Sequence, residues 1–141
     1  CRAMARDRYL DDLAKVPLFA ECSKKDLTEI ARLMTELELS GGQELMHEGG
    51  RAGSFVIIES GTADIVKDGE VITSVGPGDF VGELSLILSH PPNATVRATS
   101  DMVVHVADRS GFSQLLEEPG LAKRVLAVVA QRLADATPGS H

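Results

Sequence analysis

The segment from Gly42 to Asp108 is made of short apolar runs separated by turn residues, and no other feature constrains the fold as strongly. The runs are rich in Val, Ile, Phe and Thr, and glycine-containing turn signals recur about every eight to twelve residues. Runs of this length and spacing are typical of antiparallel all-β sandwiches and barrels. They therefore predict a β-roll over about residues 42–108. The runs read SFVIIES, GTADIVKD, GEVITSVGPG, NATVRATS and DMVVHVADRS.

Asp68-Gly69, between ADIVK and EVITSV, predicts a tight hairpin inside this region. A type I′ turn needs positive φ at its two central residues, and Asp and Gly both tolerate that conformation. The two flanking runs should therefore pair with each other.

Helical spacing of apolar residues replaces this pattern on both sides of the β region. It predicts two short helices within about residues 7–40, separated by Pro17, and two more within about residues 110–137, the first ending near Pro119. Ser23 and Asp26 resemble a capping box at the start of the second helix, and Gly41-Gly42 should end the segment. The apolar positions are Leu10, Leu13, Leu27, Ile30, Leu33, Met34 and Leu37, then Phe112, Leu115, Leu116, Leu121, Val125, Val128, Val129 and Leu133.

Together these patterns predict an α+β fold: an antiparallel β-roll, of the jelly-roll or double-stranded β-helix kind, flanked by N- and C-terminal helices. A chain of 141 residues is long enough for one compact core, so we expect a single domain over residues 1–141. No apolar run approaches the about 18 residues that a membrane span needs. The start of the chain, CRAMARDRYL, lacks a signal peptide and a leading Met, so we expect a piece of a longer protein.

Charge and cysteine content restrict the partners. The chain has 14 Lys and Arg against 21 Asp and Glu, and a net charge of −7 disfavours direct binding to nucleic acid. Cys1 and Cys22 are too few for a disulfide framework or a metal ligand set, which fits a reducing cytoplasm. We therefore expect a cytoplasmic protein without a membrane span.

One element in the β region, GPGDFVGELSLILSHPP, is neither a strand nor a simple turn. Gly76 and Gly78 flank a turn, and Gly82 permits close backbone approach before ELSLIL makes about one and a half helical turns. Unpaired N–H groups at the start of a helix attract anions, and the chain returns past that point through 93–95. The element is therefore a candidate anion-binding loop.

In their order along the chain, several segments resemble the cyclic nucleotide-binding domain, the family of catabolite activator proteins, regulatory subunits of cAMP-dependent kinase and gated ion channels. They include VPLF, FVIIESGTADIVKDG, VGPGDFVGELSLI, ATVRA and VVHVADRSGFSQLLEE, and the resemblance runs from about Val16 to Leu133. It implies a β-roll in which a phosphate-binding cassette, here residues 82–95, holds cAMP or a related nucleotide. In that cassette a Gly-Glu pair binds the ribose and an Arg pairs with the cyclic phosphate.

Transferred residue by residue, the resemblance assigns most of the cassette. Gly82 and Glu83 match the pair that binds the ribose. The positions implied to face the phosphate through backbone N–H groups, or through a side-chain amide in the case of Asn93, are Leu84, Ser85, Asn93, Ala94 and Thr95. In the transcription-factor branch a hydroxyl residue of the last helix contacts the base, and Thr137 lies at about that distance, with Pro138 directly after it.

The family arginine falls on Pro92. A charge-assisted hydrogen bond contributes about 1.5–3 kcal/mol, and an unpaired buried charge costs about 2–5 kcal/mol, so binding should weaken by about one to three decades. Arg97 is a candidate substitute, but two residues along a strand displace a side chain by about 6–7 Å. We therefore expect that Arg97 does not take over the phosphate contact of the family arginine.

Other side chains have simpler explanations. An acidic residue such as Glu83 is favourable in the first turn of any helix, which gives it a structural alternative to ribose binding. His47, His90 and His105 lack the His-x-His spacing of a cupin metal site, so we interpret them as surface or loop residues and expect no metal. No serine lies in a nucleophile motif, so we expect no catalysis.

Two functional classes stay open. The first is a regulatory module that binds a cyclic nucleotide and signals occupancy to an attached or partner effector. The second is a degenerate domain that acts as a structural or protein-interaction module. The apolar stripe at Val125, Val128, Val129 and Leu133 is either core packing or the surface of a homodimer formed through the C-terminal helix.

Overall fold

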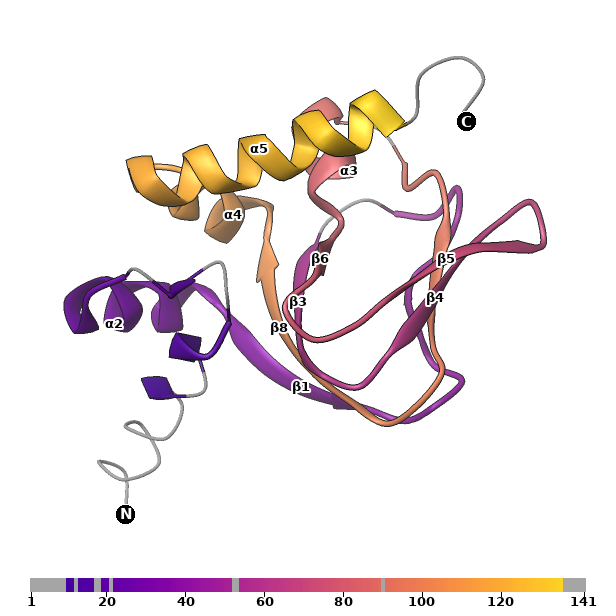
Figure 1. Ribbon diagram of the computed structural model, residues 1–141, viewed down its shortest axis with the longest axis horizontal. Coiled ribbons are helices and arrows are strands. Elements are labelled where there is room, and N and C mark those ends of the chain that lie inside the picture. Colours follow the sequence, from indigo (N-terminus) through magenta and orange to yellow (C-terminus); the bar gives the residue numbers. More distant parts are fainter. Residues whose placement is uncertain are drawn as a thin grey trace.

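The computed structural model describes residues 10–135 apart from 12, 17–18, 21, 52–53 and 90. Along the chain, a helical N-terminal part is followed by the strands of two β-sheets and then by two C-terminal helices (Figure 1). One short helix interrupts the run of strands. The elements are α2 (Lys24–Leu33), β1 (Thr35–Leu39), β2 (Glu44–Met46), β3 (Ser54–Ser60), β4 (Ala63–Lys67), β5 (Glu70–Val75), β6 (Phe80–Val81), α3 (Glu83–Leu88), β7 (Thr95–Ala98), β8 (Met102–Asp108), α4 (Arg109–Leu115) and α5 (Pro119–Asp135).

The strands form two four-stranded sheets, with orders β1-β8-β3-β6 and β2-β7-β4-β5. Every pair of neighbouring strands is antiparallel. The two sheets face each other, and α2, α4 and α5 lie on the outer side of the first sheet and at its end (Figure 1). This arrangement confirms the predicted β-roll with flanking helices.

Strand β3 separates two apolar cores. Val56 and Ile58 point between the two sheets, whereas Phe55 and Ile57 point to the helices on the other face of the first sheet. Because side chains alternate along a strand, burial on both faces produces the continuous apolar run FVII. The ring of Phe55 lies 4.8 Å from that of Phe112 in α4, measured between centroids, which joins the sheet to the C-terminal helices.

The helix α2 begins as its sequence predicts. The side chain of Ser23 accepts a hydrogen bond from the backbone N–H of Asp26, and the carboxylate of Asp26 accepts one from the N–H of Ser23. This capping box satisfies N–H groups that have no partner inside the helix.

The prediction of helix up to residue 40 is wrong. The helix ends at Leu33, and Thr35–Leu39 forms strand β1, which pairs with β8 over its whole length. The sequence TELEL fits either a helix turn or an alternating strand, and the backbone hydrogen bonds offered by β8 decide between them. Gly41 and Gly42 consequently lie in the turn between two strands instead of ending a helix.

The hairpin prediction at Asp68-Gly69 is confirmed. The two residues have φ values of 52° and 82° and join the paired strands β4 and β5.

Pro119 is the first residue of α5, a helix position where its missing N–H costs nothing.

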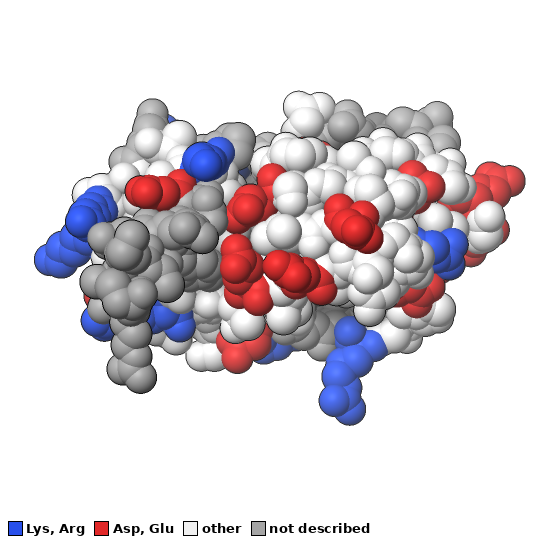
Figure 2. All heavy atoms as spheres, turned by 90° about the horizontal axis from the view of Figure 1, so that it is seen from below, with Lys and Arg blue, Asp and Glu red and all other residues white. Residues whose placement is uncertain are grey.

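The surface shown in Figure 2 carries acidic side chains toward its middle, and Lys and Arg lie mostly nearer its edges. On this face the described residues form no continuous basic patch for a phosphate backbone. Among the described residues no helix is both long and apolar enough to cross a membrane.

Candidate functional site

The loop GPGDFVGELSLILSHPP forms β6, α3 and the start of the return to β7. Gly82 joins β6 to α3 with a φ of 93°, and a side chain on it would collide with the backbone carbonyl oxygen of Ser54 in β3. Only glycine fits such a position without strain. Gly82 therefore lets the cassette lie directly against β3, and this contact alone accounts for the glycine.

Glu83 is almost completely buried, with 1% of its surface exposed, in the first turn of α3. A favourable interaction with the start of a helix requires no burial, because it also operates at the surface. Burying a carboxylate is costly unless other groups compensate for the lost water. The position is therefore more demanding for a carboxylate than the first turn of a surface helix would be.

Two other predicted site residues, Leu84 and Ser85, come directly after Glu83 in the chain. The backbone of Leu84 belongs to the same turn of α3, and Ser85 is buried, with 5% of its surface exposed. Both predicted phosphate-facing positions thus lie in the six-residue helix that carries Glu83.

The second half of the cassette is held by a turn that follows β2. The N–H of Gly49 donates a hydrogen bond of 2.9 Å to the carbonyl oxygen of Pro92, and the N–H of Glu48 donates one of 2.9 Å to Oγ1 of Thr95. Pro92, Ala94 and Thr95 are buried, whereas Asn93 is exposed. Sequence reasoning missed the contribution of this turn, because no local pattern links EGG to a segment more than forty residues away.

Positive charge is absent from the cassette sequence, since Gly82 to Val96 contains no Lys or Arg. Arg97, the candidate substitute, is half exposed and bonds to Oε2 of Glu44 at 3.2 Å. Its strand neighbours Val96 and Ala98 point into the core between the sheets, so Arg97 points to the outer face. The structure thus places its guanidinium in an ion pair outside that core.

Glu44 is held by two partners. Nδ1 of His47 lies 2.9 Å from its Oε1, and Arg97 contacts its other oxygen. The hydrogen bond from His47, followed by that from Arg97, lowers the pKa of the Glu44 carboxyl below its usual value. This keeps Glu44 ionised and strengthens its hold on Arg97.

Arg109 connects the cassette to the C-terminal helices. It is the first residue of α4, and its Nη1 donates a hydrogen bond of 3.2 Å to the carbonyl oxygen of Leu86 in α3. The last carbonyl groups of a helix need partners from outside it, and a cation is favourable at that end. A movement of α3 would therefore act directly on the start of α4.

The apolar stripe on α5 is mostly core. Leu121, Val125 and Val129 are buried in the cluster that packs against the first sheet, and Val128 is partly buried beside them. Leu126, in contrast, is 57% exposed. Thr137, the predicted base contact, lies outside the described residues, as does His90.

The interpretation of His105 as a surface or loop residue is wrong. His105 lies in the middle of β8 and has no exposed surface. Its Nε2 is 2.8 Å from Oε1 of Glu59, so the buried ring has a polar partner. The alternating run MVVHVAD places this side chain toward the helices, and that alternation was the signal that sequence reasoning overlooked. His47 is exposed, as expected.

Comparison with known proteins agrees with this geometry. The family model described as the cyclic nucleotide-binding domain matches residues 36–119. The chain is 34% identical over 127 residues to the acetyltransferase Pat of Mycolicibacterium smegmatis, covering 87% of the chain and 38% of that protein. It is 33% identical over 109 residues to the cAMP-dependent protein kinase regulatory subunit of Debaryomyces hansenii, covering 77% and 24%.

A solved structure of cAMP-bound PfPKA-R superimposes with a TM-score of 0.82 at 27% sequence identity, and the match covers 99% of the chain and 49% of that structure. In each of these comparisons the chain spans less than half of the protein it matches.

Proposed function

The chain belongs to the cyclic nucleotide-binding domain family, and from this premise we propose that it senses a cyclic nucleotide and signals occupancy to an effector. The effector is either an attached domain or a separate protein, and the cytoplasm is the compartment we predict. Regulatory and enzymatic relatives both contain this domain, so the proposal assigns binding, and no catalysis, to these 141 residues.

The observation that carries the proposal is the buried carboxylate of Glu83 directly after Gly82. In a cyclic nucleotide complex this carboxylate would accept hydrogen bonds from the ribose hydroxyl groups. Charge-assisted hydrogen bonds of this kind are about twice as strong as neutral ones. The phosphate would lie near the backbone of Ser85 and Ala94, which are both buried.

Pro92 makes the affinity weaker than that of a cassette with an arginine. Its ring offers no charge and no N–H donor, and Arg97 is engaged by Glu44. The missing charge-assisted hydrogen bond contributes about 1.5–3 kcal/mol, which corresponds to about one to two decades in Kd. Backbone N–H groups are then the principal donors to the phosphate.

The route from ligand to effector runs through Arg109. A ligand that pulls on Glu83 biases the position of α3, and the bond from Arg109 to Leu86 passes that bias to α4 and then to α5. Because Leu121 and Val125 are buried in the domain's own core, a homodimer through α5 would use exposed positions such as Leu126.

Isothermal titration calorimetry with cAMP and cGMP, up to millimolar ligand, tests the proposal. We expect measurable binding that Glu83→Gln weakens by about tenfold or more, because the neutral amide forms weaker hydrogen bonds with hydroxyl donors. Glu70→Gln, in an exposed position of β5, removes the same charge outside the cassette and should leave binding unchanged.

The outcomes separate the two functional classes. Binding that depends on Glu83 supports a sensor. If the wild type does not bind but Pro92→Arg does, the pocket is intact, the proposal that the natural chain senses a cyclic nucleotide is wrong, and the alternative of an interaction module is favoured. If neither protein binds either nucleotide, the proposal is wrong.

A further inference from the structure

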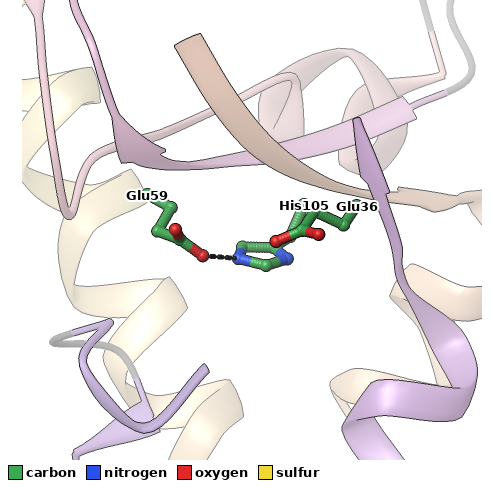
Figure 3. A group of neighbouring side chains, drawn as sticks. All are labelled: Glu36, Glu59 and His105. Atoms are coloured by element: carbon green, nitrogen blue, oxygen red, sulfur yellow. Dashed lines mark hydrogen bonds and ion pairs between the residues drawn. The ribbon is translucent and has the colours of Figure 1, made fainter. Parts of the chain in front are cut away.

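Three side chains that could ligate a metal lie together on the face of the first sheet that packs toward the helices, outside the cassette. Glu36 comes from β1, His105 from β8 and Glu59 from β3 (Figure 3). Glu36 and His105 are directly opposite in the register of β1 and β8. Glu59 lies at the irregularity between Ile58 and Ser60, where the pairing of β3 with β8 shifts. Three adjacent strands of one sheet thus hold the cluster.

The distances are short for groups of this kind. One ligand atom from each of Glu36, Glu59 and His105 lies within 4.8 Å of the other two. Figure 3 shows the carboxylate of Glu36 overlapping the imidazole of His105, whose Nε2 lies 2.8 Å from Oε1 of Glu59. Ligand atoms about 2.0–2.2 Å from one tetrahedral ion lie about 3.3–3.6 Å apart. Side-chain rotations that shorten the longest of the separations would bring all three atoms around a single ion.

The three side chains differ in how far they are buried. His105 has no exposed surface, the side chain of Glu59 is 22% exposed, and Glu36 is exposed. The sheet therefore holds a buried nitrogen donor beside two carboxylates that are more accessible to solvent. Rigid elements hold ligand geometry more accurately than loops do.

A cavity of about 210 Å³ borders one member of the cluster and is lined by Glu59 together with Lys15, Val16, Ile58, Pro77 and Gly78. Water molecules in this cavity would complete a coordination shell on the Glu59 side of the cluster.

We propose that Glu36, Glu59 and His105 form a binding site for a divalent transition-metal ion, with Zn²⁺ as its occupant. One imidazole and two carboxylates are ligands that Zn²⁺ accepts, whereas Mg²⁺ and Ca²⁺ prefer oxygen ligands alone. The ion offsets the repulsion between two carboxylates on one sheet face. It also cross-links β1, β8 and β3, so it stabilises the fold independently of any nucleotide.

Titration of the full chain with Zn²⁺ by calorimetry, with thermal unfolding in Zn²⁺ or EDTA, tests this proposal. We expect one bound ion and a higher Tm with Zn²⁺ than with EDTA. Glu36→Gln removes an exposed ligand that the fold does not need, and it should weaken binding by about tenfold or more. Glu38→Gln is the matched control, because Glu38 is an exposed glutamate on the same strand and outside the cluster.

A second ligand variant sharpens the result. Glu59→Gln should weaken Zn²⁺ binding as Glu36→Gln does. Circular dichroism of each variant confirms that the loss is not one of folding. Absence of binding to the wild type at millimolar Zn²⁺ overturns the proposal. Equal affinities for wild type, Glu36→Gln and Glu59→Gln also overturn it, because the ion then lies elsewhere.

Discussion

Replacing Pro92 by arginine tests the central physical argument about this cassette. Pro92 is buried, and its carbonyl oxygen already accepts a hydrogen bond from Gly49, so the backbone at this point is held in place. An arginine there adds a guanidinium at the position where the family resemblance predicts one. Two charge-assisted bonds in a fork are the strongest contact that a side chain offers a phosphate.

The size of the effect follows from that contact. A hydrogen bond to a charged group contributes about 1.5–3 kcal/mol, so Kd for cAMP should fall by about 10- to 150-fold. Loss of the proline ring adds freedom to the unfolded chain and should lower the free energy of unfolding by about 0.4–1 kcal/mol. The substitution thus strengthens ligand binding while it slightly weakens the fold.

Calorimetry with cAMP measures the gain, and two controls locate its source. Adenosine has the base and ribose without the phosphate, so Pro92→Arg should leave its affinity unchanged. Pro91→Arg makes the same substitution at the exposed neighbouring position and should change cAMP affinity far less. The reasoning is refuted if Pro92→Arg gains nothing, if Pro91→Arg gains as much, or if adenosine gains equally.

Three further outcomes are expected. Gly82→Ala should lower the free energy of unfolding by about 1–3 kcal/mol, more than Gly69→Ala does, because both have positive φ but only Gly82 faces a carbonyl oxygen; equal losses in urea unfolding would contradict this. Glu44 has a lowered pKa, so its contribution is present above about pH 4.3 and is lost as the pH falls through the folded-state pKa. Wild type and Glu44→Gln should therefore converge in stability in acid, and a constant difference between pH 7 and pH 3 would count against the assignment. Arg109→Met should speed amide hydrogen exchange in Glu83–Leu88, because Leu86 loses a donor; unchanged exchange would argue against the link.

Local patterns determined several parts of this protein in advance. The capping box at Ser23 and the hairpin at Asp68-Gly69 depend on residues one to three positions apart, so the sequence alone predicts them. The glycine-punctuated β runs predict the β-roll for the same reason, since strand period and turn chemistry are properties of neighbouring residues. The turn at Gly82 and the short helix after it are local features too, whereas their interpretation as a nucleotide cassette came from the family resemblance.

Only the tertiary structure decided which partners these segments meet. Thr35–Leu39 became a strand because β8 offered it backbone hydrogen bonds, and His105 became buried because helices cover its face of the sheet. The turn at Glu48-Gly49 holds the cassette from more than forty residues away, and Arg97 is bound by Glu44 at a separation of 53 residues. Such contacts depend on the packing of whole sheets, and no pattern of neighbouring residues encodes them. The fold, through the ion pair of Arg97 with Glu44, therefore decided that this guanidinium lies outside the core between the sheets.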